Sequence, residues 1–315
     1  MRQIMQQEAK EITLPKFPEF TKLSLAHQPI IERYTHKFPP YSDYTFASLW
    51  CWNEGDVLEV ADLHGNLVVK FLDYFSKERF FSFLGDNQIE KSLNDLFDCV
   101  AYTAGYLPRL QFIPEHNLHT LPLTFHERYI VEEDRDNHDY IYALDELATM
   151  AGGKYQTPRN FINRFTRRYS WQTRVLNLAD AHDWQDITQL LESWILNKAE
   201  GGMKVDVDLH ALMRLRSLLN QVAVFALGLY VDGTLCGYTI NELKQQGYAT
   251  NLFEHANTDY VGVFKFIKKQ TALHLKQMGY QYWNHQQDSG FLGLRKSKES
   301  FRPAFYLKKL TIHRK

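Results

Sequence analysis

Hydrophobic and polar positions follow one pattern that occurs twice along the chain, within residues 57–110 and again within residues 222–284. Each occurrence predicts a hairpin, a further strand, a helix whose apolar positions share one face, and a last strand. A Gly-Tyr pair precedes the last strand both times, as Gly105-Tyr106 and Gly279-Tyr280. The repeated order predicts an α/β (α+β) fold with two similar lobes in tandem, rather than one doubly wound sheet.

The predicted organisation has three parts. Residues 1–20 are polar and proline-containing and predict a loose arm. We expect a first lobe at residues 21–150 and a second at residues 151–315, each with mixed strands flanked by helices. The second lobe begins with a basic helix at residues 157–169, for which Thr157 fits the N-cap. Thr258 or Asp259 is expected to cap the helix that ends before Gly279.

The basic helix combines an apolar stripe with an arginine-rich face. Residues 154–179 carry six basic residues and no acid. Because solvated helices usually mix both signs, this face predicts contact with a polyanion such as tRNA or with a phosphate-bearing ligand. Two other interpretations remain open: an ordinary surface helix, or neutralisation within the molecule by the acidic residues 132–139.

Composition limits the functional classes. The chain has 315 residues, of which 44% are hydrophobic, enough for two cores. The formal net charge is −1, so any attraction to nucleic acid must come from local charge segregation. Three distant cysteines do not form a disulfide framework, and no apolar run is long enough to span a membrane. These features predict a soluble, cytoplasmic protein.

A candidate site follows the aromatic strand predicted near residues 280–283. Asn284, Gln286 and Asp288 alternate as they would on one face of a strand. Two glycines follow, and then a cluster of cations made of Arg295, Lys296, Lys298 and Arg302. Fixed positive charge just beyond a strand end is typical of a site for an anionic ligand. The alternative is a solvated loop and helix.

This stretch resembles the closing signature of the family that includes the C-terminal catalytic domain of bacterial phosphatidylglycerol lysyltransferases. Further matching segments precede it in the family's order: Asp139-Tyr140-Ile141-Tyr142, Gly152-Gly153-Lys154, Arg159-Asn160-x-Ile162-x-x-Phe165, Asp232-Gly233 and Glu254-His255-Ala256. The resemblance covers roughly residues 20 to 310. It implies a tandem acetyltransferase-like (GNAT) fold. For the lysyltransferase members it implies transfer of an aminoacyl group from charged tRNA to a lipid hydroxyl.

Acyl or aminoacyl transfer needs a group that takes a proton from the acceptor. Asp288 is the first candidate for this base or for an amine-binding carboxylate, and Glu254 is the second. The candidate substrate-binding residues are Asn284, Gln286, Arg295, Lys296, Lys298, Arg302, Arg159 and Asn160. The family usually has Glu where this chain has Gln286, and an amide cannot ionise. This difference leaves open a changed substrate or a module without catalysis.

The predicted function is therefore acyl transfer by a soluble enzyme, from aminoacyl-tRNA to a hydroxyl or amine acceptor. One alternative is a non-catalytic module that binds tRNA or another anion, and another is an N-acyltransferase that uses acyl-coenzyme A. A coenzyme A site needs a glycine-rich turn at a helix start, and residues 257–264 offer only Gly262. We expect no metal and no tightly bound cofactor. The acceptor is a small molecule, a peptide or a lipid headgroup, and the oligomeric state is left open.

Overall fold

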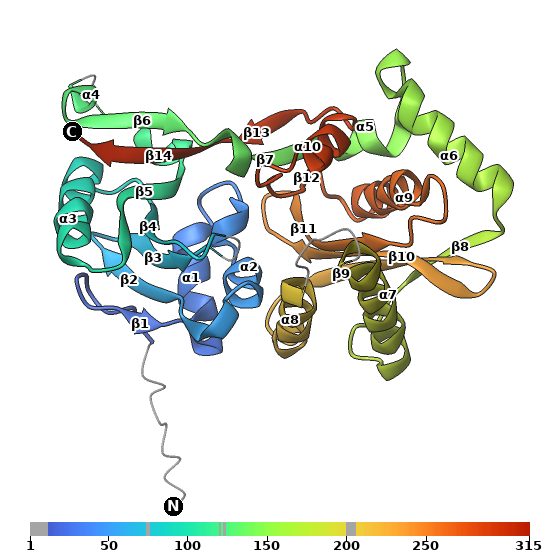
Figure 1. Ribbon diagram of the computed structural model, residues 1–315, viewed down its shortest axis with the longest axis horizontal. Coiled ribbons are helices and arrows are strands. Elements are labelled where there is room, and N and C mark those ends of the chain that lie inside the picture. The colour runs from blue at the N-terminus through green and yellow to red at the C-terminus, as the bar shows by residue number, and fades with distance from the viewer. Residues whose placement is uncertain (1–11, 74–75, 120, 122–123, 200–205) are drawn as a thin grey trace, which may run out of the picture.

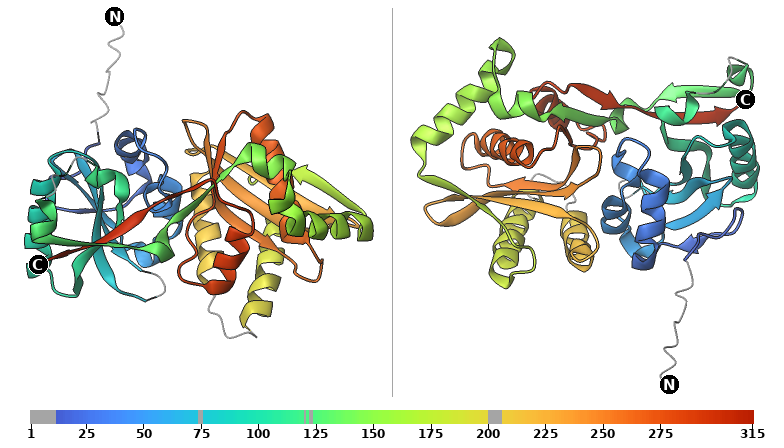
Figure 2. Two further views of the ribbon diagram at one scale, coloured as in Figure 1. Left: turned by 90° about the horizontal axis from the view of Figure 1, so that it is seen from above. Right: turned by 180° about the vertical axis from the view of Figure 1, so that it is seen from behind.

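Two seven-stranded mixed sheets build two lobes that lie side by side (Figures 1 and 2). The computed structural model describes residues 12–73, 76–119, 121, 124–199 and 206–315. The strands of the first sheet are, in spatial order, β1 (Thr21–Lys22), β2 (Glu59–Leu63), β3 (Asn66–Leu72), β4 (Arg79–Leu84), β5 (Tyr106–Pro114), β14 (Lys309–Arg314) and β6 (Tyr129–Glu133). Those of the second are β13 (Phe305–Leu307), β7 (Asp139–Ala143), β12 (Tyr282–Asn284), β11 (Tyr248–Ala256), β10 (Thr234–Leu243), β9 (Val224–Val231) and β8 (Trp171–Val175).

The predicted repeat is confirmed in both sheets. Strands β2, β3 and β4 pair antiparallel, and β4 then pairs parallel with β5 after the crossover helix α3 (Ile89–Tyr102). Likewise β9, β10 and β11 pair antiparallel, and β11 pairs parallel with β12 after α9 (Val263–Gln277). Two parallel strands run in the same direction, so the chain has to return along the sheet before the second strand begins. A tight turn joins only antiparallel strands, and a helix provides the longer return. The repeated local pattern therefore encodes two lobes of the same construction.

The two lobes exchange strands. Strand β7 follows β6 in the chain but lies in the second sheet, between β12 and β13. Strand β14 follows β13 but lies in the first sheet, between β5 and β6. Figure 1 shows both connections passing from one lobe to the other. The sheets thus do not divide at residue 150, where we predicted the lobe boundary, because hydrophobic periodicity predicts a strand without specifying its partner.

Helices cover both faces of the second sheet (Figure 1). On one face lie α7 (Ala181–Ala199) and α8 (Asp206–Leu215), and on the other lie α5 (Leu144–Thr149), α6 (Gln156–Arg168), α9 and α10 (Leu292–Glu299). In the first lobe, α1 (Gln28–Thr35) and α2 (Phe46–Cys51) lie on the side that faces the second lobe, and α4 (Phe125–Arg128) precedes β6. One apolar core continues from Leu49 of α2 to Leu212 of α8. The lobes therefore share buried surface.

Two predicted helix caps are wrong. Helix α6 begins at Gln156, so Thr157 lies inside its first turn. Helix α9 begins at Val263 after Gly262, which has a φ of 95°, rather than after Thr258 or Asp259. A side chain at Gly262 would place its Cβ 2.5 Å from the Phe161 carbonyl of α6. The close packing of α6 on the start of α9 therefore selects glycine at this position.

The N-terminal segment differs from the predicted loose arm where it is described. Residues 1–11 lie outside the described part of the chain. Leu14 is buried, and Lys16 forms a β-bridge with Asp62. Residues 14–17 are therefore attached to the first sheet. Across the described ranges, no helix is long and apolar enough to cross a membrane.

Candidate active site between the lobes

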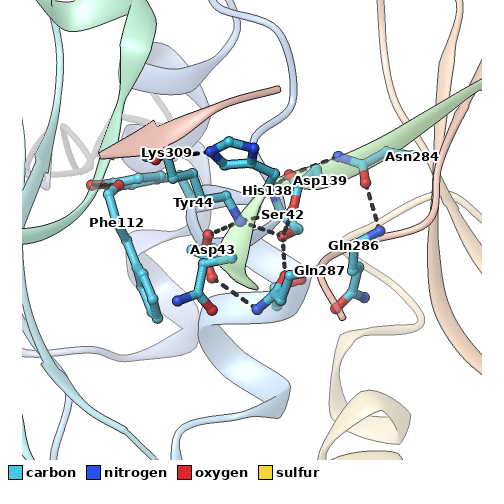
Figure 3. A network of polar contacts seen from close by, with 12 residues as sticks. Ser42, Asp43, Tyr44, Phe112, His138, Asp139, Asn284, Gln286, Gln287 and Lys309 are labelled. Carbon is cyan, nitrogen blue, oxygen red and sulfur yellow. Dashed lines mark hydrogen bonds and ion pairs between the residues drawn. The ribbon is translucent and has the colours of Figure 1, made fainter. Parts of the chain in front are cut away.

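A buried ion cluster, consisting of Lys309, Asp139 and Asp43, lies where the exchanged strands cross (Figure 3). Lys309 Nζ lies 2.7 Å from Asp139 Oδ1 and also pairs with Asp43. The Ser42 backbone N–H and hydroxyl donate to Asp139 at 2.7 and 2.6 Å. Burial opposes the charge of Lys309, but the two carboxylates outweigh it and raise its pKa. Asn284, a predicted substrate-binding residue, donates to Asp139 Oδ2 at 3.0 Å and so belongs to this cluster.

An acidic pocket of about 280 Å³ opens beside the ion cluster. We use this name for the cavity lined by Ser42, Asp43, Ser48, Leu49, Trp52, Leu58, Phe71, Leu72, Asp73, Ser76, Glu78, Phe80, Gln111, Phe112, Asp134, Asp136, Asn137, Gln286, Gln287 and Ser289. Five of these described lining residues are carboxylates and none is Lys, Arg or His. Most belong to the first lobe, and residues 286–289 of the second lobe close it. The pocket therefore suits a cationic group, for which aromatic rings also provide favourable faces.

The carboxylates of the acidic pocket are only partly neutralised. Glu78 pairs with Arg109 at 3.6 Å, and Asp136 pairs with Arg295 at 2.5 Å. Asp134 Oδ1 accepts from Asn137 at 2.8 Å, but its buried Oδ2 has no hydrogen-bond partner among the described residues. Burial raises the pKa of Asp134, as it does that of Asp43. An ammonium group placed here would supply the missing donor.

Asp288, the first predicted base, lies behind the pocket wall and is fully buried. Arg295 donates to its two oxygens at 2.9 and 2.8 Å, Tyr140 donates at 2.5 Å and Arg135 at 3.3 Å. Burial would raise the pKa of Asp288, but the Arg295 and Tyr140 hydrogen bonds lower it below its ordinary value. This carboxylate anchors the loop, and its acceptor positions are taken.

Glu254, the second predicted base, lies in a buried ion cluster, although its Oε2 makes no hydrogen bond among the described residues. It lies 3.2 Å from Lys268 Nζ and 3.5 Å from His285 Nε2. Burial disfavours its charge, but Lys268 and His285 outweigh burial and hold the pKa of Glu254 at about 2. Burial lowers the pKa of His285 to about 3, so this ring is neutral near pH 7. Glu254 stays ionised and does not accept a proton in the neutral range.

The alternation predicted for residues 284–288 ends early, because β12 stops at Asn284. Gln286 has a φ of 57°, outside the strand region, and its side chain donates to the Asn251 carbonyl at 2.5 Å. Lys298 holds the same loop by donating to the carbonyls of His285 and Gln287 at 2.5 and 2.6 Å. Burial lowers the pKa of Lys298 to about 7. The structure thus brings these predicted residues together, but in internal contacts.

The remaining predicted cations divide into internal and exposed groups. Arg159 donates to the carbonyls of Met150 and Gly152, both at 2.5 Å, and so ties α6 to the end of α5. Lys296 and Arg302 are exposed, as is Asn160. Burial raises the pKa of the Tyr155 phenol, and the nearby charge of Arg302 offsets this only in part.

The exposed face of α6 keeps its positive charge. Arg164 and Arg167 have no ion-pair partner among the described residues, and Arg168 lies over the Tyr169 ring. They line one shallow depression with Asn160 and Asn163. The acidic stretch that could have neutralised this helix pairs elsewhere, in the contacts Glu132–His313, Glu133–Lys308, Asp136–Arg295 and Asp139–Lys309.

The sequence did not identify the pocket residues Asp43 and Asp134 or the cluster lysine, Lys309. Asp139 stood in a matching family segment, but its partner is 170 residues away. No local pattern marks a lysine that pairs over such a distance. The only available signal was the abundance of acids near residues 132–139, for which pairing with α6 was one of the interpretations that the sequence left open.

Comparison with known proteins places the chain in a family. Residues 36–312 match the family model described as phosphatidylglycerol lysyltransferase, C-terminal, and the chain belongs to this family. A conserved protein of unknown function from Bacteroides thetaiotaomicron has a TM-score of 0.81 and 24% identity over 96% of this chain and 100% of that one. The C-terminal domain (DUF2156) assigned to a lysylphosphatidylglycerol synthetase from Agrobacterium fabrum has a TM-score of 0.60 and 16% identity over 90% of each chain. FemX has a TM-score of 0.57 and 9% identity over 93% and 96%. The predicted family and tandem acetyltransferase-like fold are confirmed.

Proposed function

We propose that the protein transfers an aminoacyl group from aminoacyl-tRNA to a hydroxyl or amine acceptor. The observation that carries the proposal is the unneutralised arginine face of α6 together with the acidic pocket. Arginines without internal partners suit the phosphates of tRNA. The acidic pocket suits the ammonium group that every aminoacyl ester carries. The family of the chain is consistent with separate binding places for the tRNA phosphates and for the aminoacyl ammonium group.

Packing at the start of α9 argues against acyl-coenzyme A as the donor. A pyrophosphate at a helix N-terminus needs free backbone amides and room for close approach. Here α6 covers Gly262, and the Val263 N–H donates to the Tyr260 carbonyl at 3.0 Å. Phe165 of α6 also stacks on Phe266 at 4.9 Å. The helix that carries the tRNA-facing arginines thus occupies the place a pyrophosphate would need.

In the proposed reaction, the acceptor attacks the aminoacyl ester carbonyl. A pocket carboxylate takes the acceptor proton, a new ester or amide bond forms, and the ester bond to the tRNA ribose breaks. The same carboxyl group then gives its proton to the leaving ribose oxygen and returns to its ionised form. Asp134 Oδ2, which has no hydrogen-bond partner among the described residues, is the oxygen that holds the ammonium group, so another carboxylate of the acidic pocket takes the acceptor's proton. Asp288 and Glu254 hold the surrounding loop and strands instead.

A non-catalytic tRNA-binding module is the second candidate, because Gln286 cannot ionise and its amide bridges to Asn251. The test is incubation of the full chain with a pool of tRNA carrying radiolabelled amino acids, with and without a cell extract as the source of acceptor. We expect the radiolabelled amino acid to appear in a product that remains after RNase digestion and after extraction without added base. Tight tRNA binding without any product would support the binding module. Binding of acetyl-coenzyme A in place of tRNA would overturn both.

A further inference from the structure

A second cavity, of about 300 Å³, lies between the lobes. Tyr41, Tyr44 and Thr45 line it, whereas Ser42, Asp43 and Ser48 line the acidic pocket. The segment of residues 41–49 is therefore a wall between the two spaces. Its other walls come from α1 of the first lobe and from residues 221–223 and 242–246 of the second. We call it the α1 cavity.

Two carboxylates share one ammonium group in the α1 cavity. Lys244 Nζ lies 2.7 Å from Glu32 Oε1 and 3.2 Å from Glu242 Oε1. The Lys244 side chain is 14% exposed and that of Glu242 is 2% exposed. Among the described lining residues, Lys244 is the one Lys or Arg. The site therefore carries an excess of negative charge, and its lysine is already occupied by carboxylates.

Glu242 has an oxygen without a partner. Its Oε2 is buried and makes no hydrogen bond within the described part of the chain. The Thr45 hydroxyl lies close enough to lower the pKa of Glu242 in part, but the hydrogen bond that it donates goes to Ser48 Oγ, at 3.1 Å. Burial raises the pKa of Glu242, and Lys244 offsets this only in part. A buried carboxylate oxygen without a donor is costly, so this atom marks the place of an absent donor group.

We propose that the α1 cavity binds a small organic cation, a primary ammonium on a short alkyl chain. Its N–H groups would donate to Glu242 Oε2, and its chain would lie against Leu84, Val222 and Pro39, which line the cavity. The volume is at the lower end of ligand sites, which start at about 300 Å³. An anion is disfavoured because Lys244 is enclosed by two carboxylates.

This site does not depend on the proposed aminoacyl transfer. It shares the wall of residues 41–49 with the acidic pocket, so a bound cation would fix the segment that carries Ser42 and Asp43. The α1 cavity is therefore placed to act as an effector site.

The test is a ligand-observed NMR titration of the full chain with n-butylamine, and with n-butanol and butyrate as neutral and anionic counterparts. We expect saturable binding of the amine alone. In Glu242→Gln the affinity should fall at least about tenfold, as expected for loss of a charged hydrogen bond. Glu19→Gln, which removes an exposed acid of the first lobe, should bind as the unaltered chain does.

Equal binding of butanol, or unchanged amine affinity in Glu242→Gln, would overturn the proposal. Should Glu242→Gln fail to fold by circular dichroism, Val222→Phe fills the cavity from its apolar wall and keeps the charges. Amine binding that survives in Val222→Phe would equally overturn it. Loss of amine binding in Asp134→Asn, with retention in Glu242→Gln, would assign the amine to the acidic pocket instead.

Discussion

Lys309 and Asp139 form a 2.7 Å ion pair in which both side chains have no exposed surface. Lys309 starts β14 and Asp139 starts β7, the two strands that the lobes exchange. Each residue therefore sits at the point where its strand enters the sheet of the other lobe. Breaking such a pair leaves a buried charge uncompensated, which costs far more than losing an exposed pair. An arrangement that kept these groups buried but separated them would carry this cost, so the pair favours the observed strand exchange.

Lys309→Met should destabilise the protein by about 3–5 kcal/mol, because Asp139 and Asp43 would both lose their buried cation. Urea unfolding at neutral pH measures the change. Lys308→Met is the matched control, since Lys308 is the adjacent residue and pairs with Glu133 on the surface. An exposed pair contributes little, so the control should unfold close to the unaltered chain. Equal effects of the two substitutions would contradict a special role for the buried pair.

Asp288→Asn should lower the free energy of unfolding but have only a small effect on the rate of aminoacyl transfer. The amide keeps the shape but loses the charge that holds Arg295 and Arg135, and we expect about 1–3 kcal/mol of destabilisation. Thermal unfolding and single-turnover transfer on the same sample separate the two effects. Glu299→Gln is the comparison, because Glu299 pairs with Arg135, another partner of Asp288, but its side chain is 47% exposed and lies outside the acidic pocket. Complete loss of transfer with unchanged stability would restore Asp288 as the base.

The acidic pocket should bind an amine and reject its neutral derivative. Glycinamide mimics the α-ammonium end of an aminoacyl ester, and N-acetylglycinamide lacks the charge. Asp134→Asn should weaken glycinamide binding by roughly tenfold, because the unpaired carboxylate oxygen is lost. Calorimetric titration measures the affinity for each ligand. The control is Asp86→Asn, which changes a half-exposed acid of the first lobe. If both ligands bind equally, the pocket does not recognise charge.

The arginines of α6 should determine how tRNA binding depends on salt. Replacing Arg164 and Arg167 with Gln should weaken binding and reduce the slope of log affinity against log salt by about 2, one for each phosphate contact. Filter binding at several salt concentrations gives the slope. The control is Lys22→Gln with Lys91→Gln, two exposed cations of the first lobe. A slope that falls equally in both variants would mean general charge attraction rather than a site on α6.

Stability should rise with pH above neutrality partly because of Lys298. Burial lowers the pKa of Lys298 to about 7, against an ordinary value of 10.5. Between these values the unfolded chain binds more protons than the folded one, so raising the pH favours folding. Urea unfolding at pH 7 and pH 9.5 should show a larger gain for the unaltered chain than for Lys298→Met. The same gain in both would show that Lys298 titrates normally.

Much of the fold was predictable from local sequence. The hairpin around Gly65, the helix at residues 89–102 and the Gly-Tyr pairs each follow from periodicity and turn residues a few positions apart. For the site, the sequence predicted only which region of the chain contributes to it. Residues 284–302 do border the acidic pocket, through Gln286, Gln287 and Ser289. The roles of their charges could not be assigned, because Arg295 pairs with Asp288 and Lys298 donates to backbone carbonyls, contacts that the sequence does not indicate.

The sequence by itself determined the order of a hairpin, a strand, a helix and a last strand in each lobe, the repetition of this unit, and the arginine-rich face of α6. These features depend on residues that are neighbours in the chain, so side-chain periodicity records them. Only the tertiary structure decided that β7 and β14 change sheets and that the candidate pocket is acidic. The reason is that strand pairing and ion pairing over distances such as that from Asp139 to Lys309 depend on which surfaces meet after folding.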